Sequence, residues 1–240
     1  MARPAEKIER SRVPRPRLLA AEDLGDTKGR ILDAAFRALV SGGYAALSMR
    51  EIAREAGVNH ALINYHFRTK DQLVIAVLDE ANRQLLARQR EMYRGPGDFA
   101  RKWAQARSFY ADDIASGFVR VQAELWAASL SNPELRDKFV PRILTWKRVV
   151  AEGVADAVSQ LESCGVTLPP PFTREVIATW ISEYWLGMEF TDLLGAREDR
   201  PKLKAALDAV GMLLEGLDAR VAKRAAKGTC VAPKPRRKKA

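Results

Sequence analysis

Ser48 to Lys70 reads SMREIAREAGVNHALINYHFRTK, and this stretch decides the fold. Ser48 with Glu51 three residues later is the pattern of a capping box at the start of a helix. Gly57 readily ends a helix in the left-handed conformation, and Asn59 is a good cap for a second helix. The stretch therefore predicts two short helices joined by a tight turn. This is a helix-turn-helix, whose second helix can enter the major groove of DNA.

The second helix, residues 59–66, is the candidate recognition helix. Leu62 or Ile63 should anchor it to the first helix of the chain, which begins at Asp26 or Thr27. This leaves His60, Ala61, Asn64 and Tyr65 available to bases and phosphates. An Asn side chain can read adenine through two hydrogen bonds, and an Ala methyl can meet a thymine methyl. Tyr65 and Phe67 could instead serve mainly in packing, and for Phe67 we favour packing. His60 and His66 lie roughly 120° out of alignment on a helix, a poor arrangement for a metal pair.

A further helix should come before this unit and another after it. The earlier one starts at Asp26 or Thr27, carries an apolar residue every three or four positions and ends at Gly42-Gly43. The later one opens with Thr69 and Gln72 as a second capping box. Lys70, in its first turn, is well placed to meet a phosphate.

These residues together resemble the DNA-binding segment of the TetR family of bacterial transcriptional repressors. The matching residues are Ile52-Ala53, Ala56-Gly57-Val58, Tyr65-His66-Phe67, Lys70 and Leu73. The resemblance extends back over GRILDAAFRALVSGGYAALSM and covers Thr27 to about Val77, while ELWAASLSNPELRDKF resembles the middle of such regulators more loosely. Ala61 and Asn64 stand where the family often has Gly and Tyr.

The resemblance implies which residues touch DNA. Positions that match His60, Ala61, Asn64, Tyr65, His66 and Lys70 often do so in the family. With the start of each helix included, the predicted DNA contacts are Ser48, Arg50, Asn59, His60, Ala61, Asn64, Tyr65, His66 and Lys70.

Composition indicates a soluble protein without a membrane partner. The chain has 240 residues, 47% of them hydrophobic, and no segment approaches the ~20 apolar residues of a spanning helix. The first residues, MARPAEKIERSRVPRPR, are polar and lack the apolar segment of a secretory signal. Cys164 and Cys230 are far apart and show no metal or redox spacing, which suits a reducing cytosol. We expect a cytoplasmic protein with no cofactor.

The net charge of +10 comes mostly from one end of the chain. Residues 220–240 hold nine of the 40 Lys and Arg side chains and no acid, which leaves 31 basic against 30 acidic elsewhere. A high isoelectric point is therefore weak support for specific DNA binding.

The sequence predicts an all-α protein with a small head and a larger helical body. Residues 1–25 read as a disordered basic arm, although Arg10, Arg12, Arg15 and Arg17 could follow a phosphate backbone. Residues 26–72 form the helix-turn-helix domain, and 73–222 form an effector-binding and dimerisation domain. Residues 223–240 read as a disordered basic tail. The expected body helices are 70–93, 98–116, 118–130, 133–163 (kinked or split at Pro141), 173–194 and one from 200 onward.

Dimerisation is predicted from the last two helices. In the final one, apolar residues recur at alternating spacings of four and three, as in a heptad seam. Packing within one subunit is the alternative. Because the family typically dimerises through two such helices, we favour a dimer interface made of Ile177, Ile181, Met188, Leu203, Leu207, Val210, Leu214 and Leu217.

A pocket for an unknown small-molecule effector is implied by the resemblance. Apolar walls with a few polar groups are what such a pocket needs, although aromatic residues at helical spacing are more often core. The candidates are Trp103, Phe109, Tyr110, Glu124, Trp126, Trp146, Trp180 and Tyr184.

The leading interpretation is a homodimeric repressor that binds double-stranded operator DNA and is released by the effector. An enzyme is disfavoured, because G-x-S-x-G, H-E-x-x-H and phosphate-binding glycine loops are missing from the sequence. A non-specific architectural nucleic-acid binder acting through the basic tail is the alternative. The sequence does not distinguish a repressor from an activator.

Overall fold

The computed structural model describes residue 18 and residues 26–95 and 98–230, and in these ranges the chain forms α-helices and one short 3-10 helix. The elements are α1 (Thr27–Gly42), α2 (Met49–Ala56), α3 (His60–His66), α4 (Lys70–Arg94), α5 (Phe99–Ser116), α6 (Phe118–Ser131), α7 (Pro133–Ser163), α8 (Arg174–Leu193), η2 (Arg197–Asp199) and α9 (Arg200–Ala226). The all-α prediction is confirmed.

Local capping sets most of the helix starts. In each case a side-chain oxygen accepts a hydrogen bond from a backbone N–H two or three residues later, which satisfies one of the unpaired donors at a helix start. These caps are Asp26, Ser48, Asn59, Thr69, Asp98, Asn132 and Thr173.

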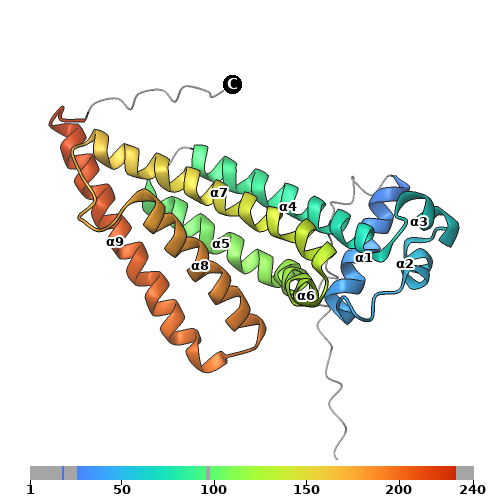
Figure 1. The fold of residues 1–240 in the computed structure, drawn as a ribbon. Coiled ribbons are helices and arrows are strands. Elements are labelled where there is room, and N and C mark those ends of the chain that lie inside the picture. Colours follow the sequence, from blue (N-terminus) through green and yellow to red (C-terminus); the bar gives the residue numbers. More distant parts are fainter. Residues whose placement is uncertain (1–17, 19–25, 96–97, 231–240) are drawn as a thin grey trace, which may run out of the picture.

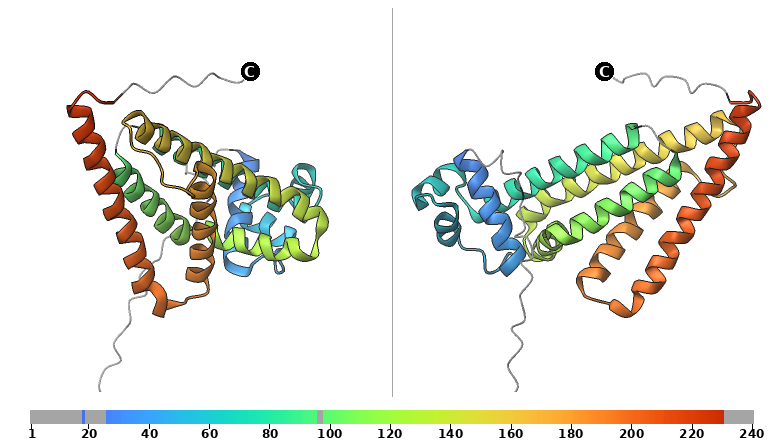
Figure 2. Two further views of the ribbon diagram at one scale, coloured as in Figure 1. Left: turned by 60° about the vertical axis from the view of Figure 1, so that its left-hand side comes forward. Right: turned by 180° about the vertical axis from the view of Figure 1, so that it is seen from behind.

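A small head of α1, α2 and α3 stands at one end of the molecule (Figure 1). From it, α4 runs into the body beside α7, and α5 lies below them. The antiparallel α8 and α9 lie toward the end of the body that is away from the head, as the right-hand view of Figure 2 shows. One long helix, α4, therefore belongs to both the head core and the body.

Part of the predicted N-terminal arm is ordered against the head. The Leu18 side chain is buried, its backbone N donates to Asp33 at 2.9 Å, and its carbonyl accepts from Gln84 at 3.0 Å. Disorder is therefore the wrong expectation at Leu18. The arginines expected to follow a phosphate backbone lie outside the described residues.

Two expectations about the body helices also change. Pro141 does not split α7, which is one helix from Pro133 to Ser163. Similarly, α9 continues to Ala226, four residues into the segment expected to be a disordered tail. Residues 231–240 of that segment lie outside the described residues.

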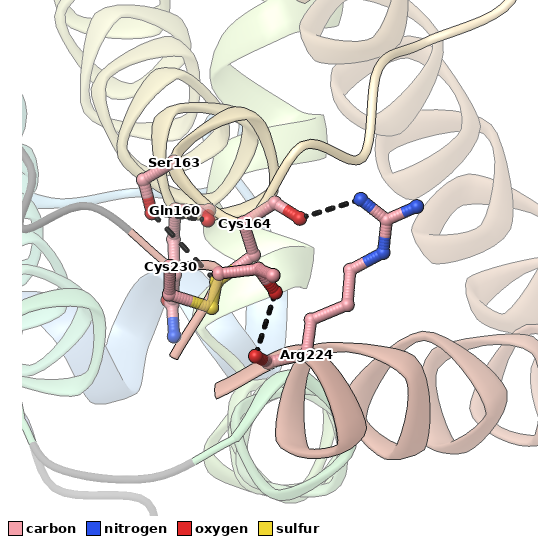
Figure 3. The surroundings of a disulfide bond; sticks show 6 residues. Gln160, Ser163, Cys164, Arg224 and Cys230 are labelled. Carbon is pink, nitrogen blue, oxygen red and sulfur yellow. Dashed lines mark hydrogen bonds between the residues drawn. A yellow bond between two sulfur atoms is a disulfide. The ribbon is translucent and has the colours of Figure 1, made fainter. Parts of the chain in front are cut away.

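The two cysteines, which their spacing in the sequence left unpaired, are joined in a disulfide (Figure 3). Cys164 directly follows α7 and Cys230 lies beyond α9, 66 positions later. Beside the bond, the Arg224 guanidinium donates to the Cys164 carbonyl at 2.8 Å. The segment after α9 is thus held against the end of α7.

Within the described ranges, no helix combines the length and the apolar character needed to cross a bilayer.

Candidate nucleic-acid interface and interior cavity

A few fully buried side chains hold the α2–α3 unit on the head. Ile52 and Ile63 belong to the same core as Phe36 of α1. Gly57 ends α2 with a φ of 64°, in the left-handed region where glycine has no Cβ penalty. Because Leu62 is exposed, Ile63 is the residue that anchors α3.

The outward face of α3 is polar and open. The side chains of His60, Ala61, Asn64, Tyr65 and His66 are all exposed, and Tyr65 is 81% exposed. On this face, Asn64 Nδ2 and His60 Nδ1 lie 3.5 Å apart. The core does not use these side chains, so they can meet bases and phosphates.

Of the other predicted DNA contacts, Ser48 and Asn59 cap the starts of α2 and α3, and Arg50 lies at the surface. Ser48 Oγ accepts from the backbone N of Glu51 at 3.4 Å, and Asn59 Oδ1 accepts from that of Ala61 at 2.9 Å. Arg50 is exposed on α2. Their contact with DNA stays a prediction. Phe67, which we expected to pack, is buried in the head core.

Lys70 folds back onto the head instead of extending outward. Its Nζ lies 4.2 Å from the centroid of the Tyr44 ring and donates to the Ala45 carbonyl at 3.4 Å. Burial lowers the pKa of Lys70, against the opposing effect of Asp71. To meet a phosphate, Lys70 must leave the face of Tyr44.

A polar joint connects the head to α6. The Tyr44 backbone N donates to Glu124 Oε2 at 3.0 Å. The Tyr44 hydroxyl donates to one oxygen of Asp71, and Asn132 Nδ2 donates to the other at 3.2 Å. Burial, followed by the nearby Asp71, raises the pKa of Tyr44 to about 12.

Gly43 is buried at a φ of 74°, where an added Cβ would stand 2.5 Å from Glu124 Oε2. Glu124, expected in the pocket, therefore holds the α1–α2 connection.

The body contains a cavity of about 710 Å³, with walls from α4, α5, α7, α8 and α9. Three predicted pocket residues line it, namely Trp103, Phe109 and Trp146. The Trp103 indole N–H also donates to the Leu207 carbonyl at 3.0 Å, which ties α5 to α9. A volume of this size suits a small molecule.

The other predicted pocket residues lie elsewhere, so those predictions are corrected. The Tyr110 hydroxyl contacts Asp192 at 3.3 Å, and Trp126 packs edge-on to Phe190 at 5.3 Å. Trp180 and Tyr184 are exposed. Helical spacing places an aromatic residue on a stripe, but it does not tell whether the stripe faces core, cavity or solvent.

The sequence reading missed a buried polar cluster where the cavity ends. Arg88 and Asp113 form an ion pair there, and burial raises the pKa of Asp113 to about 6 against the opposing effect of Arg88. Glu189 is 6% exposed. Burial, followed by Asp113, raises its pKa to about 8. Gln89 Oε1 is buried and accepts no hydrogen bond from the described residues. Acidic residues recur every few positions along these amphipathic helices, so the sequence does not indicate which of them are buried together.

Within the part of the chain that the structure describes, no group of three or more His, Cys, Asp or Glu side chains is placed to hold a metal ion.

Comparison with known proteins identifies the head. A family model for "Bacterial regulatory proteins, tetR family" matches residues 31–77, which include α2, α3 and the exposed face just described. Over these residues the chain is similar to the TetR family.

Similar proteins include regulators of both signs. Over 55 residues the chain is 51% identical to an HTH-type transcriptional repressor of Mycobacterium tuberculosis, a match that covers 23% of this chain and 29% of that protein. Over 167 residues it is 28% identical to the HTH-type transcriptional activator FasR of Mycolicibacterium smegmatis, covering 67% of this chain and 73% of that protein. The first match thus spans under a third of its relative, whereas the second spans nearly three quarters.

A likeness in fold to a solved structure also extends over the body. The crystal structure of the transcriptional regulator FadR from Bacillus subtilis in complex with stearoyl-CoA matches 77% of this chain and 96% of that chain. The TM-score is 0.61 and the sequence identity 22%, so the likeness concerns the fold.

The predicted dimer seam on α8 and α9 packs mostly inside the subunit. Met188 and Leu207 form a buried cluster with Trp185, against which Leu203 packs. Ile177 and Ile181 pack on another buried cluster, Ile181 and Leu214 line the cavity, and Leu217 is half-buried. Val210 is the member of the seam that is exposed. The large apolar side chains that α8 and α9 do expose are Trp180, Tyr184, Val210, Met212 and Leu213.

Proposed function

We propose that this protein is a homodimeric transcriptional regulator that binds operator DNA through α3 and is controlled by a small molecule bound in the body cavity. The observation that carries the proposal is the outward face of α3. It presents Asn64 and the 81% exposed Tyr65 on a helix anchored by the buried Ile63. A helix held in this way can enter a major groove without disturbing the head core.

The homodimer forms through the exposed apolar side chains of α8 and α9. Trp180 and Leu213 are each well over half exposed, and large exposed apolar side chains in a group are typical of protein interfaces. Two heads would then occupy successive major grooves of a near-palindromic operator, about one helical turn apart.

Effector control works through α4. This helix begins at Lys70 in the head and contributes Gln89 and Met92 to the cavity wall. A ligand that fits one position of α4 better than another therefore biases the spacing of the two heads, and linkage makes DNA and ligand oppose each other. FadR from Bacillus subtilis, whose fold this chain shares, was crystallised in complex with stearoyl-CoA.

We favour repression over activation because a relative that is 51% identical to this chain over 55 residues is a repressor. The regulator carries no catalytic function and works in the cytoplasm, where its DNA lies. A disulfide is uncommon in that compartment, so a thiol titration of freshly isolated protein tests whether Cys164 and Cys230 are joined there. An architectural nucleic-acid binder that acts through the basic tail leaves the exposed face of α3 without a purpose.

The test is a selection of bound duplexes from a random DNA library, followed by gel shifts with the selected sequence. We expect a palindromic consensus whose binding is weakened by Tyr65→Ala and kept by Leu130→Ala, which removes an exposed side chain from the body. Absence of enrichment, with binding that fades uniformly as salt rises, would instead favour the basic tail.

A further inference from the structure

The cavity of the body continues into a second, much smaller void. Gln89, Asp113, Trp146 and Trp185 line both spaces. The small void has a volume of about 20 Å³, which is room for a single water-sized group. Glu189 lines this small void. A molecule that fills the large cavity can therefore insert one small terminal group between Asp113 and Glu189.

The charges around the small void leave one carboxyl without a cation. Arg88 pairs with Asp113. The guanidinium of Arg142, whose side chain also lines the void, pairs with Asp79 at 2.5 Å and donates to the Lys138 carbonyl. Among the side chains that the structure describes, Glu189 makes no ion pair, and it is hydrogen-bonded to the indole of Trp185.

The hydrogen-bonding groups at this point call for a donor. Gln89 Oε1 is buried without a donor from the described residues, and such an atom costs free energy until it is paired. Arg88 Nε also lacks an acceptor, but Arg88 lines neither space, and its guanidinium carbon lies 4.7 Å from the centroid of the Phe109 ring. Trp146 and Trp185 also line both spaces, and the face of an indole ring attracts a cation.

We propose that the effector cavity takes a primary alkylamine, with its ammonium group in the small void between Asp113, Glu189 and Gln89 and its apolar part in the 710 Å³ cavity. This assignment rests on the proposed function for the role of the cavity. An ammonium group has the size of a water molecule and carries three donors. It supplies the charge that Glu189 lacks and the donor that Gln89 lacks.

Other head groups of the same chain length fit this end less well. A carboxylate would face two carboxyl groups, and like charges at short range repel. A trimethylammonium group carries the right charge, but it has no N–H donor and is too large for a space of about 20 Å³. An alcohol fits the space but leaves Glu189 without a cation.

Binding of the amine is coupled to loss of a proton. Glu189, with a pKa raised to about 8 mainly by burial, is largely protonated at pH 7. The groups that face it are Asp113 and Tyr110 of α5, Arg88 of α4 and Arg142 of α7. An ammonium ion beside Glu189 favours the carboxylate, so the proton passes to the buffer and about one proton leaves per site.

The experiment measures binding of decylamine, decan-1-ol, decanoate and decyltrimethylammonium to the full-length protein at pH 7. All four are used below their critical micelle concentrations, with Trp fluorescence as the readout. We expect decylamine to bind at least about tenfold more tightly than each of the other three, since a charge-assisted hydrogen bond contributes more than a neutral one. Equal binding of decyltrimethylammonium would overturn the proposal, because its head cannot enter the small void.

Variants locate the head group. Glu189→Gln keeps the shape of the protonated side chain and should lower decylamine affinity about tenfold without changing decan-1-ol affinity. Calorimetry in two buffers of different ionisation enthalpy should show that proton release is lost as well. Glu152→Gln, on the exposed side of α7, is the matched control. Asp113→Asn is the second variant, should Glu189→Gln fail to fold. Unchanged decylamine affinity in the folded variants overturns the proposal.

Binding and regulation can fail separately. Tight decylamine binding without any effect on the operator complex would leave the amine site standing and contradict effector control through α4. Release from the operator by decanoate, with no binding of decylamine, would support effector control and overturn the amine assignment.

Discussion

Tyr65 shows how far one residue can be tested apart from the fold. Its side chain is 81% exposed, so truncation removes almost no packing. We expect Tyr65→Ala to weaken operator binding by about 1–3 kcal/mol, roughly 5- to 150-fold, because a lost base or phosphate contact has that magnitude. Titration of labelled operator measures the affinity, and the unfolding temperature should stay unchanged. Unchanged operator affinity of the Tyr65→Ala variant would contradict the assignment of α3 as the recognition helix.

Glu189 gives the pH dependence of stability. Its folded pKa of about 8 lies above the ordinary value of 4.5. The contribution of Glu189 to the free energy of unfolding is therefore fully present below pH 4.5 and is lost as the pH rises through 8. Between pH 6 and 9 we expect a loss of about 3 kcal/mol.

Thermal unfolding of the wild type and of Glu189→Gln at both pH values checks this. Over this range the unfolding temperature of the wild type should fall by roughly 5–10 °C more than that of the variant. The reason is that about 1 kcal/mol of stability shifts the unfolding temperature of a domain of this size by a few degrees. Parallel pH profiles for the two proteins would show that Glu189 ionises normally in the fold.

The roles of single residues differ in how well they can be predicted from the sequence. Ser48, Asn59 and Thr69 could be read directly, because a helix cap acts on a backbone N–H two or three positions away. Glu189 could not, since its pKa and its place beside Asp113 depend on three other helices meeting there. Glu124 was misplaced for the same reason, as its partner Tyr44 lies 80 positions earlier.

At the scale of elements, the break between α5 and α6 fits the body to the head. Gly117 has a φ of 84°, and a Cβ on it would lie 2.7 Å from both Val40 methyl groups of α1. We expect Gly117→Ala to destabilise the protein by about 2–3 kcal/mol, from backbone strain together with the clash.

Gly195→Ala is the matched control in urea denaturation. Gly195 has a φ of 73° with no atom within 4 Å of an added Cβ. It should therefore show the strain alone, about 1 kcal/mol. Equal losses in the two variants would mean that Val40 moves aside without cost.

Periodicity predicted the stripe on α9 but not its neighbour. Leu203, Leu207 and Leu214 do recur at helical spacing, and that is a property of the sequence near them. Whether the stripe meets α5, a cavity or a second subunit depends on Trp103 and Trp185, which come from other parts of the chain. For this reason the helices themselves could be predicted, while the interface and most of the pocket could not.

At the scale of the whole molecule, α4 places the cavity and the DNA-facing surface on one helix. Lys70, at its first turn, touches the Tyr44 ring, and Gln89, more than four turns later, lines the cavity. The joint of Tyr44, Asp71 and Asn132 connects that first turn to the body. A ligand that moves α4 must therefore also disturb the hydrogen bonds that position the head.

The assembly of two such molecules can be tested on α9 with two leucines six positions apart. Leu213 is 65% exposed, whereas Leu207 is 7% exposed and packs on Trp185 and Met188. Leu213→Glu should leave the subunit folded and convert the dimer to a monomer with weak operator binding, because a charge in an apolar interface must be desolvated. Leu207→Glu should instead lower the stability of the subunit by several kcal/mol for the same reason. Light scattering after size exclusion gives the mass, and circular dichroism gives the fold. A Leu213→Glu protein that remains dimeric would move the interface away from the exposed face of α9.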